Sequence, residues 1–307
     1  MSEIRQAVGH YLSVRRALGY KFYVEGRLLA QFADFLEQRG QQHVTTAAAL
    51  EWATAPSGAA TDWWGARMTV IRGFARFQAG FDARTEIPPT DLFARNPGQR
   101  QEPYLYSEHE IAELLHAARR MRHALRAATF ESYIGLLAAT GMRPGEGMRL
   151  DRHEADLRRG LLTVRDTKFG KSRLIPLHAS AIEQLEGYRR DRDRLCPRPS
   201  SEAFFLSGAG TRLNYTNAST SFNELLARAG IWPGAEPKPR LYDLRHTFAV
   251  TTLASWYEQD LDVAHLLPTL STYLGHVSPA TTYWYLHACP MLMTAAAERL
   301  ETSWSHA

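Results

Sequence analysis

The sequence predicts a mainly α-helical protein of two domains, with one small β-sheet in the second domain, so that the fold class is α+β. Residues 1–90 contain four segments with apolar side chains at helical spacing, and a stretch rich in proline and glycine follows them. A strand pair is predicted only beyond that stretch. Because the 307 residues give each half enough chain for its own core, we expect a helical bundle over 1–90, a linker over 91–103 and a second domain over 104–307.

Amphipathic periodicity predicts the four helices of the first domain. Apolar residues recur every three or four positions, and threonine hydroxyls stand where they can cap the third helix. The predicted helices span residues 3–18, residues 24–39, Thr45 or Thr46 to the residue before Pro56, and Thr61 to Ala79.

The fourth helix carries two arginines, Arg72 and Arg76, whose i,i+4 spacing places both on one side of its surface. Two interpretations stay open for them: a solvated helix face, or contacts with phosphate groups.

The second domain begins with a sharp helix signal. Ser107 and Glu110 have the spacing of a capping box, and a further helix is predicted over 125–140, where Gly141 ends it. Two strands over 161–165 and 172–177 form a hairpin, and the remaining elements are helices.

Composition excludes some classes of protein but does not identify one. The net charge of +4 and the pI of 9.1 are compatible with a nucleic-acid partner. The two cysteines, Cys196 and Cys289, have no neighbours at metal-ligand spacing, so we expect packing roles for them and no metal site. No signal peptide or membrane span is predicted, and we therefore expect a cytoplasmic protein.

Four segments of the second domain combine basic residues with a histidine and a tyrosine. Each is unremarkable alone, but together they occur in a fixed order, and His276 precedes Tyr285 by nine positions. The segments are Ala139–Glu146 with Arg143, Asp166–Arg173 with Lys168 and Lys171, Leu241–Ala249 with Arg245, and Leu274–Tyr285 with His276.

In this order and spacing the segments resemble the catalytic domain of the tyrosine recombinases, the phage integrase family. The resemblance covers residues 104–290, and the amino-terminal bundle resembles that family's core-binding domain. It implies a helical clamp of two domains around duplex DNA and a catalytic set of Arg143, Lys168, Tyr242, Arg245, His276 and Tyr285.

The chemistry of such a site explains the residue types. Transfer of a phosphodiester to tyrosine builds negative charge that Arg143 and Arg245 can stabilise. A phenol with a pKa of about 10 must lose its proton, and the departing 5′-oxygen needs one, for which Lys168 is the expected donor.

Other residues are expected to support this set. We expect Glu146, Asp243 and His246 to orient the catalytic groups, and Lys171 and Arg173 to contact the DNA backbone.

Two tyrosines compete for the role of nucleophile. In a helix Tyr283 and Tyr285 point about 200° apart, so that only one can face the arginines, and the family spacing selects Tyr285. Tyr242 departs from the family pattern, which most often has histidine there; a phenol can donate a hydrogen bond to phosphate but accepts protons poorly. We expect Tyr242 to stabilise phosphate while His276 or solvent takes the proton.

The resemblance also implies partners. These are double-stranded DNA with a specific recombination site, a homotetramer on that DNA, accessory DNA-bending proteins, and association with the nucleoid when bound, with no cofactor. Two other functions remain open: a type IB topoisomerase, and a DNA-binding accessory factor that has lost catalysis. The apolar residues after Tyr285 predict a tail helix, which packs either on a neighbouring protomer or on its own domain.

Overall fold

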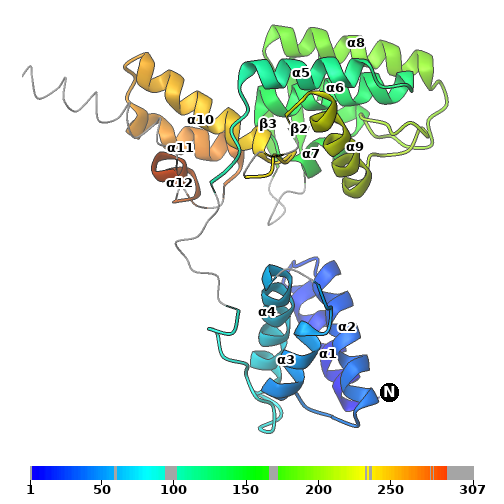
Figure 1. The fold of residues 1–307 in the computed structure, drawn as a ribbon, viewed down its shortest axis with the longest axis vertical. Helices are drawn as coiled ribbons and strands as arrows, with labels where there is room; N and C mark the ends of the chain where they lie inside the picture. Colours follow the sequence, from blue (N-terminus) through cyan, green and yellow to red (C-terminus); the bar gives the residue numbers. More distant parts are fainter. Residues whose placement is uncertain are drawn as a thin grey trace, which may run out of the picture. The chain divides into compact units, whose positions relative to one another are not determined.

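The computed structural model describes residues 2–58, 61–93, 102–165, 172–231, 234, 237–276, 278 and 280–288 (Figure 1). The chain divides into two compact units, Met1–Arg100 and Gln101–Ala307. The described residues are mostly helical with one small antiparallel sheet, which confirms the predicted α+β fold class.

Four helices lie in the described part of the first unit, and their positions confirm the four predicted from periodicity. They are α1 (Glu3–Ala17), α2 (Tyr23–Gln38), α3 (Thr46–Thr54) and α4 (Thr61–Gln78). Thr45 caps α3, since its Oγ1 accepts a hydrogen bond from the backbone N–H of Ala48 at 3.2 Å. The apolar faces meet in a core that includes Leu29, Phe32 and Phe74, each fully buried.

Arg72 corrects one prediction for this unit. Its side chain is buried rather than on the surface of α4. Its Nε donates to the carbonyl of Pro88 at 3.0 Å, and its Nη2 donates to the carbonyl of Pro89 at 2.6 Å. Arg72 therefore fastens the chain that follows the helix, and its donors are used inside the protein. Arg76, one turn later, is exposed.

The second unit contains eight α-helices, one short 3₁₀ helix and three strands in its described part. The elements before the last three helices are α5 (Glu108–Arg119), α6 (Ala124–Thr140), α7 (Pro144–Arg149), η1 (Arg152–Glu154), β1 (Ala155–Asp156), β2 (Leu161–Val164), β3 (Arg173–Pro176), α8 (Ala179–Leu195) and α9 (Tyr215–Arg228). The predicted hairpin is confirmed as β2 and β3, which pair in antiparallel register with Leu162 opposite Ile175. The two-residue strand β1, which completes the order β1-β2-β3, is too short to produce a periodic signal.

The predicted start of α5 and the predicted end of α6 are both confirmed. Ser107 and Glu110 form the expected capping box at α5. Helix α6 ends at Gly141, whose φ of 59° lies in the left-handed region. A side chain at Gly141 would collide with the ring of Phe248, so glycine lets α6 approach this ring closely before the chain turns to Arg143.

The last three helices share a smaller apolar cluster. They are α10 (Asp243–Glu258), α11 (Val263–Leu274) and α12 (Ala280–Ala288). Buried side chains from all three meet here, among them Leu253, Leu267 and Tyr285. None of the helices in the described ranges has an apolar stretch long enough to cross a lipid bilayer.

Candidate active site

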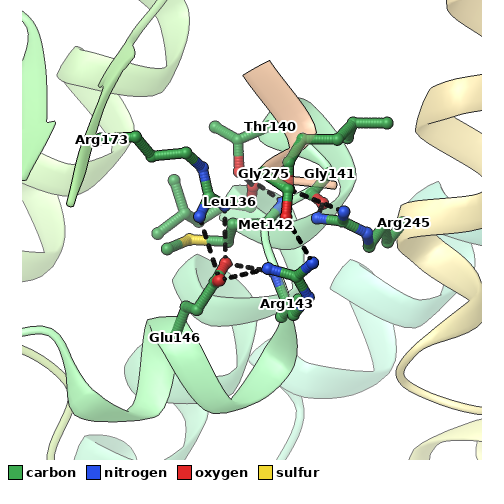
Figure 2. Close-up of polar contacts among 10 residues, drawn as sticks. Leu136, Thr140, Gly141, Met142, Arg143, Glu146, Arg173, Arg245 and Gly275 are labelled. Atoms are coloured by element: carbon green, nitrogen blue, oxygen red, sulfur yellow. Dashed lines mark hydrogen bonds and ion pairs between the residues drawn. The ribbon is translucent and has the colours of Figure 1, made fainter. Parts of the chain in front are cut away.

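Arg143 lies where α6 gives way to α7, at the residue that precedes the first turn of α7. Its Nη1 donates to Oε1 of Glu146 at 2.8 Å, and its Nη2 donates to the carbonyl of Gly275 at 2.8 Å (Figure 2). The side chain remains 29% exposed. The guanidinium is therefore fixed from two sides while part of it faces solvent.

Glu146 is the buried anion of this arrangement, with 2% of its side chain exposed. It accepts hydrogen bonds from both Arg143 and Arg173 (Figure 2). Burial alone would raise the pKa of Glu146, but the hydrogen bonds and positive charge of Arg173, together with the bonds from Arg143, lower it to about 2. The carboxylate stays ionised and orients two guanidinium groups.

Arg173, at the start of β3, corrects the prediction that it contacts the DNA backbone. Its Nη1 and Nη2 lie 3.0 and 2.7 Å from the two oxygens of Glu146, and only 13% of its side chain is exposed. This fork-on-fork geometry uses the donors that a phosphate would need. No local signal in the sequence could have revealed the pairing, because 27 residues separate the partners.

Arg245, in the first turns of α10, is 1% exposed. Its Nη1 donates to the carbonyl of Gly141 at 2.9 Å (Figure 2). Its Nη2 donates to the carbonyl of Leu274 at 2.7 Å. Its buried Nε has no hydrogen-bond partner among the described residues. Burial, with a smaller contribution from Arg143, lowers the pKa of Arg245, so this cation is held where an anion would be favoured.

Asp243 was expected to orient the catalytic groups, but its partner lies outside the expected catalytic set. The fully buried carboxylate accepts instead from Arg240, with Nη2 of Arg240 2.9 Å from Oδ1. The two backbone carbonyls hold Arg245 in place of an acid.

His276 follows α11 and the glycine that ends it. Its Nδ1 lies 2.7 Å from the hydroxyl of Thr282, which belongs to α12 and is fully buried. Burial and then the positive charges of Arg245 and Arg143 lower the pKa of His276 to about 3. The imidazole is therefore neutral at physiological pH and can donate a hydrogen bond, but it is a weak proton acceptor.

The two candidate tyrosines of α12 differ in burial, as their helical spacing predicts. Tyr285 is 2% exposed, whereas Tyr283 is 45% exposed. The ring of Tyr285 lies nearly parallel to that of His276, with centroids 6.4 Å apart. Tyr285 is also near enough to Arg245 for the two to interact electrostatically. Of the two phenols, Tyr285 is the one beside the basic groups.

His246 contacts Tyr285 more directly than the sequence predicts. Its Nδ1 lies 2.9 Å from the phenolic oxygen of Tyr285. The ring of Tyr242, the residue just before α10, packs edge-on against His246 with centroids 5.1 Å apart. The contact between His246 and Tyr285 joins residues 39 apart, so no local pattern in the sequence could have revealed it.

The segment that contains these residues is similar to a known protein family. A sequence model described as the phage integrase family matches residues 105–290, which is more than half of the chain. The chain belongs to the phage integrase family. A putative integrase/recombinase y4rB from Sinorhizobium fredii is 43% identical to it over 311 residues, with 99% of each chain covered. Tyrosine recombinase XerC from Chlamydia trachomatis is 28% identical over 222 residues, covering 72% of this chain and 65% of the relative.

Solved structures of integrases and recombinases share the fold of this family member. The XerH recombinase bound to a palindromic difH substrate has a TM-score of 0.64 at 19% identity, with 94% of this chain and 82% of that one covered. The Tn1549 transposon integrase in complex with transposon right-end DNA has a TM-score of 0.66 at 16% identity, with coverage of 96% and 99%. The chain is an enzyme of the tyrosine recombinase type.

Some predicted features of this integrase lie outside the described residues. These include Lys168 and Lys171 in the hairpin, Cys289, and the predicted tail from residue 289 onward. Within the described ranges, no group of three or more His, Cys, Asp or Glu side chains is arranged to hold a metal ion.

Proposed function

We propose that this phage integrase family member is a site-specific recombinase that cuts and rejoins DNA through a 3′-phosphotyrosyl bond to Tyr285. The observation that carries the proposal is the convergence of Arg143, Arg245 and the pair His276 and Tyr285 from three separate segments of the second unit. Arg143 donates to the carbonyl of Gly275, 132 residues along the chain, and Arg245 donates to that of Gly141, 104 residues before it. The ring of His276 stacks on that of Tyr285.

The charge of this site suits phosphoryl transfer. The partly exposed guanidinium of Arg143 and the buried one of Arg245 would stabilise the negative charge that develops on the non-bridging oxygens. The buried Nε–H of Arg245 has no hydrogen-bond acceptor in the described part of the chain, and a phosphate oxygen would satisfy it. Neutral His276 would add a hydrogen bond to the same phosphate.

The proposed reaction has two chemical steps, cleavage of one DNA strand and rejoining. The phenolic oxygen of Tyr285 forms a bond to phosphorus as the bond from phosphorus to the 5′-oxygen breaks. The phenolic proton leaves Tyr285, and Lys168 supplies a proton to the 5′-oxygen. In the reverse reaction, the 5′-hydroxyl of a second strand attacks the phosphotyrosyl group. The covalent bond conserves the energy of the DNA linkage, so that no nucleotide is consumed.

Recombination also implies an assembly. The likeness to structures that contain a recombination site or a transposon end supports duplex DNA with a specific site as the partner. Exchange of two strands between two duplexes requires several active sites, which a tetramer of this chain would supply, with the protein on the nucleoid while bound. Accessory DNA-bending proteins would shape that complex.

The test is to trap the covalent intermediate. The protein is incubated with duplexes that carry a nick within a randomised sequence, and DNA that stays attached under denaturing conditions is sequenced to find the site. On the selected duplex, Tyr285→Phe should form no adduct, whereas the matched control Tyr283→Phe should form it at the rate of the unaltered protein. An adduct in Tyr285→Phe would overturn the proposal.

The same DNA separates the two other functions. Relaxation of supercoiled plasmids without the selected site, at catalytic amounts of protein, would indicate a topoisomerase. Binding to the selected duplex without any adduct would indicate an accessory factor.

A further inference from the structure

The phenol of Tyr285 has a defined partner in the absence of DNA. Nδ1 of His246 lies 2.9 Å from its oxygen, which is a good hydrogen-bond distance. The contact joins α10 to α12 across 39 residues, and the two rings meet edge-on with centroids 5.5 Å apart. Of the described imidazole groups, this one touches the oxygen that would attack phosphorus.

We propose that His246 is a catalytic residue that takes the proton from Tyr285 during DNA cleavage and returns it during rejoining. The inference rests on the proposed function, and it identifies the acceptor of the phenolic proton in the cleavage step. It replaces our sequence-based expectation that His276 or solvent takes this proton.

The other groups near the phenol are less suited to the task. Nδ1 of His276 already contacts the Thr282 hydroxyl at 2.7 Å, and burial together with the two arginines lowers the pKa of His276 and keeps the imidazole neutral. Tyr242 carries a phenol, which accepts a proton poorly at neutral pH. His246 is better placed than either, because its Nδ1 is an imidazole nitrogen that can accept a proton and lies 2.9 Å from the phenolic oxygen.

The neighbours of His246 keep its ring oriented. Tyr242 packs edge-on against it from the position just before α10, and Trp284 packs edge-on from α12 with centroids 5.8 Å apart. For Nδ1 to accept a proton, the neutral ring must carry its own proton on Nε2. The proton then moves from the phenolic oxygen to Nδ1 as the bond from oxygen to phosphorus forms. When Tyr285 departs in the rejoining step, the imidazolium returns the proton to it.

The decisive variant is His246→Asn, since an asparagine places a polar atom close to the position of Nδ1 but cannot accept a proton there. Single-turnover formation of the covalent adduct is measured on the selected duplex from about pH 6 to pH 10. The variant should be slower by roughly 100-fold near neutrality, and the deficit should shrink toward pH 10, where the phenol ionises without a base.

The pH profile must be interpreted against the ionisable groups around His246. These are Tyr242 just before its helix, Arg245 on the same helix, Tyr285 on α12, and His276 after α11. A purely structural role would lower the adduct rate equally at every pH. An equal loss at every pH, or a rate in His246→Asn that matches the unaltered protein at neutrality, would overturn the inference.

A modified substrate separates His246 from the group that protonates the leaving oxygen. When sulfur replaces the bridging 5′-oxygen, the leaving thiolate needs no proton. Lys168→Ala should then recover toward the parental rate, whereas His246→Asn should keep its full deficit.

Two further variants serve as controls for this test. If His246→Asn unfolds, His246→Ala leaves a space that added imidazole can enter, and imidazole should restore the adduct rate. Tyr285→Phe shows which claim has failed. An adduct in that variant would contradict the proposed function itself. If Tyr285→Phe forms no adduct and His246→Asn forms it at the parental rate, only the role of His246 is contradicted.

Discussion

Glu146 binds both terminal nitrogens of Arg173, with its two oxygens 3.0 and 2.7 Å from Nη1 and Nη2. Arg143 donates to the same carboxylate. One buried anion thus positions the guanidinium of the residue before α7 and that of the first residue of β3. The carboxylate compensates two cations in the region where the proposed function would bring a phosphate.

The ionisation of Glu146 should make the stability of the protein depend on pH. Because the pKa of Glu146 is about 2 in the folded chain and near its ordinary 4.5 when unfolded, its stabilising contribution is complete above about pH 4.5 and is lost as the pH falls toward 2. Between about pH 5 and pH 3 the free energy of unfolding should fall by on the order of 2 kcal/mol more in the unaltered protein than in Glu146→Gln. Urea unfolding at several pH values measures this, and parallel pH dependences would contradict it.

Gly275 should be required for the alignment of the arginines. Its φ is 69°, its carbonyl accepts from Arg143, and a Cβ there would lie 2.9 Å from Nη1 of Arg173. Gly275→Ala should therefore lower the rate of adduct formation at least about 10-fold, besides the cost of about 1 kcal/mol for a left-handed alanine.

Gly230 offers a matched control for this substitution. Its φ is 70°, but a Cβ there would meet nothing within 4 Å. Gly230→Ala should lose about the same 1 kcal/mol of stability in urea unfolding and keep the parental rate. Equal rates in the two variants would show that Gly275 does not act through the arginines.

Tyr242 should contribute through its hydroxyl. Tyr242→Phe keeps the ring that packs against His246 and removes only a hydrogen-bond donor near Arg245. Loss of one donor to the phosphate should slow adduct formation by at least about 10-fold. Single-turnover rates on the selected duplex decide this, and a rate equal to that of the unaltered protein would remove Tyr242 from the phosphate site.

The two arginines of α4 should behave in opposite ways. Arg72→Ala should lower the stability of the protein by about 1–3 kcal/mol, because the carbonyls of Pro88 and Pro89 lose the hydrogen bonds that Arg72 donates. Arg76→Ala should leave the stability nearly unchanged. If Arg76 contacts a phosphate, the substitution should also reduce the slope of log K for DNA binding against log salt concentration by about one. Urea unfolding and binding titrations at several salt concentrations measure both effects. Similar stability losses in the two variants would contradict this assignment.

The sequence by itself determined the local structure and the identity of the main candidate residues. Apolar periodicity and caps such as Thr45 and Ser107 depend on neighbours within one or two turns, so the helices could be predicted closely. The choice of Tyr285 over Tyr283 needed only the angle between two positions of one helix, and the burial of the two side chains agrees with it.

Only the tertiary structure decided which partner each charged or polar group has. Arg173 binds Glu146, Asp243 binds Arg240, and His246 reaches Tyr285. Arg240 and Asp243 lie only three residues apart, but the other partners lie on different elements, and their pairing depends on how helices and strands pack. A buried donor takes whichever acceptor that packing brings near, and no periodic pattern in the chain encodes this choice.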